Sequence, residues 1–314
     1  MRKVIGIDFG GINLKGGIVS EDGALLIKHP GLKTRGKRPG TDIAEDIVGI
    51  ARYLLQRESS IEAVAIGSPG IILPDGTYGF PPVNCPNWGA VNLKAMLENK
   101  LHRPCFVNND AQVFGAGERR WGAGRDAQCM LMLTLGTGIG GGLSYRGQDF
   151  QGARNTIEIG HICVDFSPTA ALCGCGNRGC AEAYASDTGI SNQAREAIER
   201  GLLPKPAGDI EAKWIYDLAQ AGNPVAAGII DRAHRALSAL IAGFANGLSI
   251  DVCILAGGIT GAGDFLFDDV RARVKARLIP TAEVDIRPAS LGAEFGVLGA
   301  AAYAFDLLDA PPAP

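Results

Sequence analysis

The sequence predicts an α/β protein of two domains. Its 314 residues exceed the roughly 250–300 residues at which one hydrophobic core stops growing. β-rich and helical segments alternate along most of the chain, which is typical of α/β folds. A strand, a glycine turn and a second strand occur at 5–19 and again at 129–146. This repetition suggests duplicated halves, each of which offers a backbone loop to a shared ligand.

The first half opens with strand-like runs at 3–9, 14–19 and 24–28, separated by glycine-containing turns. These runs predict a β-meander. Asp42 and Glu45 have the spacing of a capping box, and the apolar residues that follow lie on one helical face, so a helix is expected over 42–57. A strand at 61–66, a helix near 91–101 and a strand at 105–108 then complete an α/β pattern.

The second half begins near residue 129 with the apolar run CMLMLTL, the glycine turn at 136–142 and a strand through Tyr145. Strands are expected after it at 252–256 and 283–287. Helices are expected at 182–200, 211–220, 224–247, 264–278 and 296–308. The last helix ends the fold, and the remaining residues, APPAP at 310–314, read as a frayed tail.

Charge and cysteine content narrow the class of protein. There are 33 acidic and 30 basic residues, which leaves no positive excess for a polynucleotide backbone, so we expect no nucleic-acid partner. No apolar run reaches the ~18 residues of a membrane span, and the early charges argue against a secretory signal. We therefore expect a cytoplasmic protein without a membrane partner. In a reducing compartment its eight cysteines are better explained as metal ligands or buried thiols than as disulfides.

The chain contains 44 glycines, about twice the usual share, concentrated in a few loops. Two stretches partly match known phosphate-binding motifs but lack a feature that each motif requires. Residues 31–38 nearly match a P-loop, but Arg38 replaces the magnesium-binding hydroxyl and Pro39 follows. Residues 136–141 satisfy G-x-G-x-x-G, yet GLSYRG follows where a dinucleotide-binding fold needs a helix.

The two strand–turn–strand segments remain as candidate nucleotide loops. In the first, amides of Gly10 and Gly11 can meet phosphate oxygens, Lys15 can add charge, and Asp8 can hold Mg²⁺ directly or through water. Alternatively, Asp8 satisfies turn amides and Lys15 is solvated. In the second, the hairpin around Gly136 and Gly138 can surround a phosphate, or it is simply a flexible turn.

Asn109 and Asp110 follow the strand at 105–108 and precede a helix. Asn and Asp are favoured as helix N-caps, which is one explanation for them. The other is chemical: Asp110 accepts a proton from a substrate hydroxyl while Asn109 orients that substrate. Both can hold, because strand ends face the ligand in α/β domains.

His161, Cys173, Cys175 and Cys180 form a H-x11-C-x-C-x4-C pattern with glycines between the cysteines. One imidazole and three thiolates make a closed tetrahedral Zn²⁺ shell, so a structural zinc is expected. The alternative is a set of unrelated buried thiols. Glu158 and Glu182 bracket the cluster, and there they can accept hydrogen bonds from a polyhydroxylated ligand or remain solvated acids.

Together these segments resemble the ROK family, within the actin-like and hexokinase superfamily, over nearly the whole chain. The matching stretches are DFGGINLK at 8–15, GSPG at 67–70, NNDA at 108–111, LTLGTGIGGG at 133–142, EIGH at 158–161, CGCGNRGCAEAYAS at 173–186 and LAGGI at 255–259. The pair EIGH and CGCGNRGCAEAYAS is very specific to the family.

The resemblance implies an ATP-dependent sugar kinase with two actin-like (ribonuclease H-like) lobes, an interlobe cleft and a zinc loop. The lobes would span 1–112 with 293–314, and 113–292. ATP, Mg²⁺ and Zn²⁺ are the implied cofactors, and a homodimer or homotetramer is the expected assembly. The implied roles are general base for Asp110; sugar binding for Asn109, Glu158, His161 and Glu182; and nucleotide binding for Asp8, Gly10, Gly11, Lys15, Gly136, Thr137, Gly138, Gly257 and Gly258.

In this resemblance, one ring nitrogen of His161 binds zinc and the other faces the sugar. Two departures stand out. Ile12 occupies a position where the family usually has Thr, which weakens the expected ATP site. Thr156-Ile157 replaces a small Ala-Gly pair before Glu158, so the sugar pocket is expected to be reshaped.

Glucose is the best single candidate for the substrate and the 6-hydroxyl for the acceptor. Kinases of N-acetylmannosamine, N-acetylglucosamine or fructose are the alternatives. A sugar-sensing ROK regulator is the non-enzyme alternative, but Val4 already lies in the first strand, where a regulator would need a preceding helix-turn-helix domain. An actin- or chaperone-like ATPase would not need the zinc loop, Glu158 or Glu182.

Overall fold

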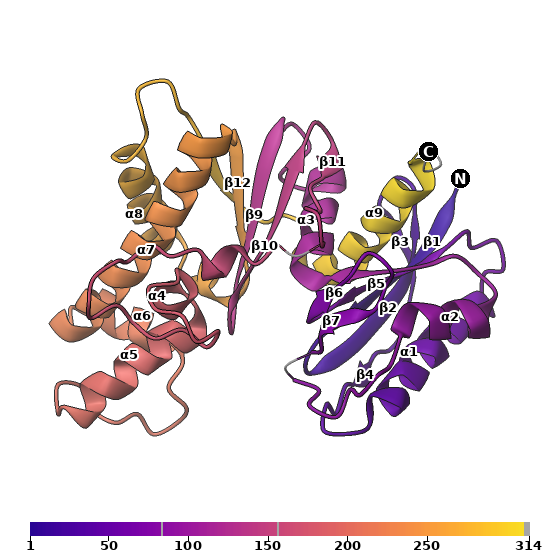
Figure 1. The fold of residues 1–314 in the computed structure, drawn as a ribbon, viewed down its shortest axis with the longest axis horizontal. Coiled ribbons are helices and arrows are strands. Elements are labelled where there is room, and N and C mark those ends of the chain that lie inside the picture. Colours follow the sequence, from indigo (N-terminus) through magenta and orange to yellow (C-terminus); the bar gives the residue numbers. More distant parts are fainter. Residues whose placement is uncertain (83, 156, 311–314) are drawn as a thin grey trace. The chain divides into compact units, whose positions relative to one another are not determined.

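The computed structural model describes residues 1–82, 84–155 and 157–310. The chain forms two compact units. Unit 1 contains Met1–Ala127, Gly142–Ile157 and Ala289–Pro314, and unit 2 contains Gln128–Gly141 and Glu158–Pro288. Both are α/β, as the sequence predicts, and Figure 1 shows the elements of each.

Unit 1 is built on a six-stranded sheet. Its strand order is β3-β2-β1-β5-β8, with β4 paired to β2. The first three strands are antiparallel, which confirms the predicted β-meander, and β5 and β8 extend β1 in parallel. The strands are β1 (Lys3–Phe9), β2 (Asn13–Ser20), β3 (Leu25–Lys28), β4 (Leu32–Lys33), β5 (Val64–Ser68) and β8 (Cys105–Asn109).

Helices cover both faces of this sheet (Figure 1). On one face lie α1 (Gly40–Leu55) and α2 (Leu93–Leu101), and the predicted stripe of α1, with Ile43, Ile47, Ile50 and Leu54, is fully buried there. On the other face, α9 (Phe295–Asp309) packs small residues against Val4, Val19 and Ala65. The last helix thus belongs with the first strands. A short hairpin, β6 (Ile71–Ile72) and β7 (Tyr78–Phe80), is an addition that the sequence pattern did not predict.

The predicted domain boundaries differ from the observed units because α3 (Asp110–Trp121) stays in unit 1. It packs against α9 so closely that a Cβ on Gly117 would lie 2.9 Å from Gly299 Cα. Buried Glu118 strengthens the attachment, since its carboxylate accepts hydrogen bonds from the amides of Ser290 and Leu291 at 2.8 and 3.0 Å. Helix α3 therefore joins unit 1, and residues 142–157 also lie in that unit.

Unit 2 contains most of a sheet with the order β11-β10-β9-β12-β13, and the boundary between the units passes through β10. Strands β9, β12 and β13 are parallel. The strands are β9 (Cys129–Leu135), β10 (Ile139–Tyr145), β11 (Gln148–Asp149), β12 (Val252–Ala256) and β13 (Asp285–Pro288). The predicted strand at 283–287 thus begins two residues later.

Four helices of unit 2 pack around a fifth, α7, whose apolar face is buried. The five are α4 (Glu182–Ala185), α5 (Asp187–Glu199), α6 (Ala212–Gln220), α7 (Pro224–Leu248) and α8 (Asp264–Lys275). Short 3₁₀ turns η1 (Ile159–His161) and η2 (Gly258–Ala262) lie in this unit, and η3 (Gly292–Glu294) lies in unit 1. No helix in the described ranges is both long and apolar enough to cross a membrane.

Two predicted helix boundaries were wrong. Helix α1 begins after Pro39 without a side-chain cap, so Asp42 and Glu45 form no capping box. Its start is set by packing: a Cβ on Gly40 would lie 2.2 Å from Trp88 O. The predicted helix at 182–200 breaks at Ser186, which adopts an extended backbone and caps α5 through the Gly189 amide.

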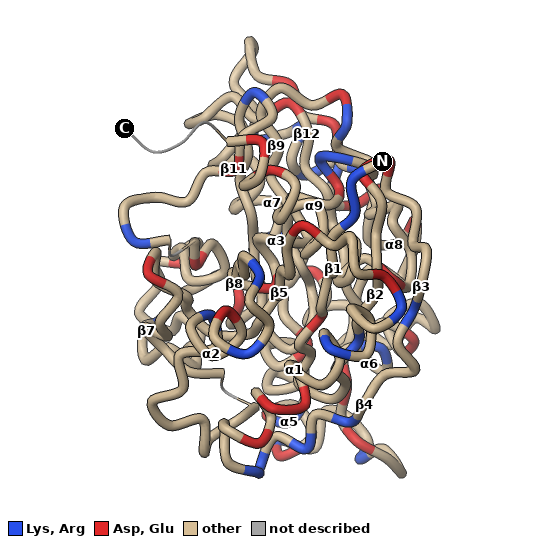
Figure 2. The backbone as a smooth tube through the Cα atoms, turned by 90° about the vertical axis from the view of Figure 1, so that its right-hand side faces the viewer, with Lys and Arg blue, Asp and Glu red and all other residues tan. Residues whose placement is uncertain are grey.

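Lysines and arginines are interspersed with acidic residues along the chain (Figure 2). Many form ion pairs. In unit 1, Arg119 contacts Asp149 at 2.9 Å and also pairs with Asp306, which contacts Arg120 at 2.9 Å. This network fixes α3 against α9 and the segment that carries β11.

Candidate functional site

The polar residues predicted in unit 1 lie at one edge of its sheet. In the parallel register Asp8 pairs with Gly67, Gly67 with Asn108, and Ser68 with Asn109. Because parallel strands end at the same edge, the first glycine turn, the 67–70 turn and the start of α3 are neighbours there. The structure thus brings together three of the segments that the sequence singled out.

Asp8 is an acid at this edge whose pKa is shifted. Burial raises its pKa to about 6, an effect that Lys15 opposes and Glu294 reinforces. The start of α9 closes over it, because a Cβ on Gly296 would lie 2.5 Å from Asp8 Cγ. Lys15 is opposite Asp8 in the β1–β2 register. The charged form of a buried carboxylate beside a single lysine is stabilised further when another cation lies nearby.

The first glycine turn is tighter than expected. The Gly10 amide donates to Asn13 O at 3.0 Å, so it is engaged within the turn, contrary to the expectation that it faces a phosphate. Within the described ranges, no hydrogen bond occupies the Gly11 amide. The side chain of Ile12 is 71% exposed at the tip of the turn. Only Gly11 of the glycine pair therefore offers a free amide there.

Asn109 is the N-cap of α3. Its Oδ1 accepts from the amides of Ala111 and Gln112, at 3.0 and 3.4 Å, and its Nδ2 donates to Gly70 O at 3.0 Å. The capping explanation is therefore confirmed. Asp110, the first residue of α3, accepts from the Ala111 amide at 2.8 Å. These bonds hold both side chains at the sheet edge.

Sequence reasoning missed a buried amide network behind this cap. Asn155 Nδ2 donates to Asn108 Oδ1 at 2.8 Å and to Ile72 O at 3.0 Å, and Gln112 Nε2 donates to Asn155 O at 3.3 Å. The residue type at position 155 was the signal available in the sequence. Asn155 has φ +55°, and asparagine adopts positive φ more readily than most residues. The network ties the segment before Glu158 to β8 and α3. Thr156 lies outside the described residues.

In unit 2 the second glycine turn and the 257–258 turn share an edge. Strands β9 and β12 are parallel neighbours with Ala256 beside Thr134, so the turns that follow them are adjacent. Gly257 has φ +99°, and a Cβ there would lie 2.4 Å from Leu135 O, so glycine is required. The Gly136 amide is engaged with Gly138 O at 3.0 Å. Within the described ranges, the Thr137 and Gly138 amides have no such partner.

Glu182 connects this turn to the cysteine cluster. One carboxylate oxygen, Oε2, accepts from the Ile139 amide at 2.8 Å. The other, Oε1, lies 3.8 Å from His161 Nδ1 and 3.7 Å from Cys173 Sγ. A Cβ on Gly138 would lie 2.5 Å from Oε2, so the turn passes directly over the carboxylate. Glu182 is positioned by both elements at once.

The four predicted metal ligands converge. One ligand atom from each of His161, Cys173, Cys175 and Cys180 lies within 4.8 Å of the others. Cys175 Sγ is 3.7 Å from Cys180 Sγ, and Cys173 Sγ is 3.5 Å from His161 Nδ1. Tetrahedral ligands at the ~2.3 Å zinc–sulfur distance lie ~3.8 Å apart. The donor set and its spacing therefore fit a zinc ion.

Cys163 is separate from this set. Its Sγ contacts Asp165 O at 3.3 Å and Arg178 O at 3.7 Å. Its backbone pairs with that of Cys180, which helps to close the loop. The geometry therefore places Cys163 outside the ligand group.

Glu158 and His161 form the outer face of the cluster. His161 Nε2, the ring nitrogen directed away from Cys173, lies 4.0 Å from Glu158 Oε2. Burial raises the pKa of Glu158, and the nearby Glu182 adds to the rise, while His161 opposes it. Two carboxylates and one imidazole nitrogen are thus grouped on one surface of unit 2. They offer the acceptors and the donor that a ring of hydroxyls requires.

Comparison with known proteins places the chain in a family. Residues 4–306 match the ROK family. A glucokinase of Thermotoga maritima is 39% identical, with 95% of this chain and 96% of the relative covered. An N-acetylmannosamine kinase of Yersinia pseudotuberculosis is 29% identical, with 97% and 99% covered.

Solved structures agree. A ROK hexokinase from Thermus thermophilus has a TM-score of 0.86 at 29% identity, covering 98% of this chain and all of the other. A ROK family glucokinase from Streptomyces griseus, in complex with glucose and AMPPNP, has a TM-score of 0.74 at 31% identity, with 95% and 98% covered. The chain belongs to the ROK family. It has the actin-like fold of these kinases and is a sugar phosphotransferase.

Proposed function

We propose that this protein is an ATP-dependent hexose kinase that phosphorylates the 6-hydroxyl of its sugar, with glucose as the first candidate. The observation that carries the proposal is the grouping of Glu158, His161 and Glu182 on the cysteine cluster. The glucokinase of T. maritima and the glucose complex of the S. griseus enzyme support the choice of glucose.

We assign sugar binding to Glu158, His161 and Glu182, with Asn109 as a further contact. The two carboxylates accept hydrogen bonds from sugar hydroxyls, which favours their charged forms. Zinc, held by His161 and the three cysteines, would fix the loop and the ring tautomer. With Nδ1 directed to the metal, Nε2 carries the proton and can donate to a hydroxyl beside Glu158.

Asp110 is the proposed general base. It accepts the proton of the acceptor hydroxyl while the sugar oxygen bonds to the γ-phosphorus and the bond to the β–γ bridging oxygen breaks, which releases ADP. The hydrogen bonds of Asn109 hold this end of α3 against the 67–70 turn. Asp110 would thus meet the sugar from a fixed helix terminus.

The nucleotide is assigned to the two glycine turns and to 257–258. The Gly11, Thr137 and Gly138 amides and Lys15 would meet phosphate oxygens, whereas Gly10 and Gly136 shape their turns. Mg²⁺ supplies charge neutralisation on the phosphates, and Asp8 is the residue proposed to hold it, directly or through water. Gly257 and Gly258 would border the adenosine.

Kinases of N-acetylmannosamine, N-acetylglucosamine or fructose are the alternatives, and the Yersinia relative favours the first. A sugar-responsive regulator is the non-enzyme alternative. We also propose a homodimer or homotetramer, to be checked by light scattering. A cytoplasmic location is proposed because a thiolate metal site requires reduced cysteines.

A coupled assay of ADP release tests the function. It uses ATP, Mg²⁺ and, in turn, glucose, mannose, fructose, allose, N-acetylglucosamine and N-acetylmannosamine. We expect release to depend on the sugar and to be fastest with glucose. Faster turnover of an N-acetylated sugar would replace glucose within the same class. Sugar-independent release, or none with any sugar, would contradict the kinase proposal.

A further inference from the structure

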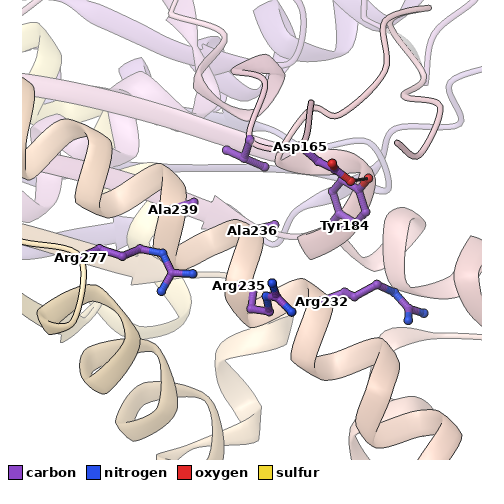
Figure 3. Close-up of a pocket in the computed structure, with 8 residues that line it drawn as sticks. Asp165, Tyr184, Arg232, Arg235, Ala236, Ala239 and Arg277 are labelled. Atoms are coloured by element: carbon purple, nitrogen blue, oxygen red, sulfur yellow. Dashed lines mark hydrogen bonds between the residues drawn. The ribbon is translucent and has the colours of Figure 1, made fainter. Parts of the chain in front are cut away.

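A polar cavity lies in unit 2, and its lining includes no residue of the 136–142 glycine turn. It has a volume of about 320 Å³ and opens between α7, the segment after α8 and the loop that follows His161. Figure 3 shows Arg232, Arg235 and Arg277 along one side, with Asp165 and Tyr184 across from them. Three guanidinium groups thus share the cavity with one carboxylate.

Two of these arginines have no acidic partner in the part of the chain that the structure describes. Among residues 1–82, 84–155 and 157–310, no carboxylate pairs with Arg232 or Arg277. Arg235 makes one long contact, 3.7 Å to Asp231, whose other oxygen is held by Arg273 at 2.8 Å. Three like charges that line one cavity repel each other, and an anion there removes the repulsion.

The side chains of Arg232 and Arg277 each donate a hydrogen bond to a neighbouring residue. Arg232 Nε donates to Gln193 Oε1 at 2.7 Å, which leaves its terminal nitrogens for a ligand. Arg277 Nη1 donates to Arg273 O at 3.1 Å, and the backbone of Arg277 is tied to α7, because Asn246 Nδ2 donates to Arg277 O at 3.0 Å. Across the cavity the Tyr184 hydroxyl donates to Asp165 at 2.5 Å and accepts from the Ala171 amide at 2.7 Å. The bonds on Arg232 and Arg277 reduce the entropy that these two side chains lose on binding.

We propose that this cavity binds the phosphate group of a small phosphomonoester. Guanidinium forks match the oxygens of a phosphate, and a dianion suits three positive groups set against one negative group. The cavity is at the small end of ligand sites, which span roughly 300–1,000 Å³, so it suits a monosaccharide phosphate or inorganic phosphate. Asp165 can accept from a sugar hydroxyl in the first case.

The cavity adjoins the proposed sugar site through the chain itself. Tyr184 is two residues beyond Glu182 in α4, and Asp165 is four residues beyond His161. Gln193, which holds Arg232, also donates to Tyr184 O at 3.3 Å. A phosphate bound in this cavity would lie beside Tyr184, in the helix that carries Glu182, so we expect it to change the KM of the sugar substrate.

Isothermal titration calorimetry of the full chain, with its metal retained, tests the proposal. The probes are inorganic phosphate and glucose 6-phosphate, each against sodium chloride of equal ionic strength. The Arg232→Gln/Arg277→Gln variant is compared with Arg52→Gln/Arg103→Gln, which removes two charges from unit 1. Thermal unfolding of both variants checks that they fold.

We expect the first variant to bind at least one of the probes ~10-fold more weakly or worse, and the second to bind as the native chain does. If the arginine substitutions weaken the binding of glucose 6-phosphate more than that of inorganic phosphate, the cavity is a sugar phosphate site. If they weaken both equally, it is a phosphate site. Equal binding by all three proteins, or heat that chloride reproduces, would overturn the proposal. The measured quantity is the difference in affinity between variants, so binding of glucose 6-phosphate at any other site contributes equally to both and cancels. The result therefore does not depend on kinase activity.

Discussion

The Glu182 carboxylate accepts a hydrogen bond from the Ile139 amide at 2.8 Å, while its other oxygen lies 3.8 Å from His161 Nδ1. One side chain thus links the second glycine turn, proposed to hold phosphate, to the cluster proposed to hold zinc and sugar.

Glu182→Gln tests that link. Glutamine can keep the bond to the Ile139 amide, but it lacks the charge that strengthens bonds to sugar hydroxyls. We predict a sugar KM about 10–100-fold higher with a nearly unchanged melting temperature, measured by steady-state kinetics and calorimetry. Glu199→Gln, at the exposed end of α5, is the matched control. Equal KM values in the two variants would remove Glu182 from the sugar site.

Asp110→Asn addresses the base. Asparagine can still accept from the Ala111 amide, so the start of α3 should persist, but it cannot take up a proton. We predict a fall in kcat of about 10²–10⁴-fold with a small change in sugar KM. Unchanged turnover would show that the base is assigned wrongly, even if the protein is a sugar kinase.

The raised pKa of Asp8 predicts that the free energy of unfolding depends on pH. Its pKa is about 6 in the folded chain against a usual value of 3.8, so the folded state binds the proton more tightly. Its stabilising contribution is full below about pH 4 and is lost as the pH rises through 6. Asp8→Asn should therefore be the more stable protein at pH 7.5, by on the order of 1–3 kcal/mol, with a smaller difference at pH 4.5.

Urea unfolding of the native chain and Asp8→Asn at the two pH values measures this difference. The same variant should lose turnover if Asp8 holds Mg²⁺. A difference in the free energy of unfolding that is equal at both pH values would contradict the raised pKa of Asp8.

The metal cluster makes a prediction about composition. Elemental analysis should find one zinc per chain in the native protein and none in Cys173→Ser/Cys175→Ser, whose loop should also be cleaved faster by protease. Cys163→Ser is the control, since its sulfur lies outside the ligand group and is bonded to Asp165 O instead. Zinc retained by the double variant would contradict the assignment, as would zinc lost from Cys163→Ser.

Ile12 stands where the ROK family usually has Thr, and a single substitution restores the threonine. Its side chain is 71% exposed, so Ile12→Thr should restore a hydroxyl to the phosphate turn without disturbing the core. We predict a KM for ATP about 2–10-fold lower, the range of one added hydrogen bond. Ile12→Val has the shape of threonine without the hydroxyl and should not reproduce the effect; if it does, the hydroxyl is irrelevant.

Sequence patterns predicted the elements of this fold best where local signals agreed with packing. The apolar stripe of α1 was correct because its four residues all face the sheet. The predicted start of that helix was wrong, because contact between Gly40 and Trp88 overrides the capping pattern at Asp42 and Glu45. The break at Ser186 is also tertiary: the Asp187 amide bonds to Gly136 O at 2.8 Å, which ends α4 early.

The site shows the same division. Spacing predicted that His161, Cys173, Cys175 and Cys180 lie together, since three cysteines within eight positions with glycines between them can converge in a short loop. It did not distinguish Gly10, whose amide closes the turn, from Gly11. Nor could it find Asn155, whose partners Ile72 and Asn108 are distant along the chain.

The most direct test of the proposed function is identification of the product. The native chain is incubated with ATP, Mg²⁺ and glucose, and the mixture is followed by ³¹P nuclear magnetic resonance. We predict ADP and glucose 6-phosphate in equal amounts, with neither formed when sugar is omitted. ADP with inorganic phosphate at the same rate with and without sugar, or no consumption of ATP with any of the six sugars, would contradict the central claim.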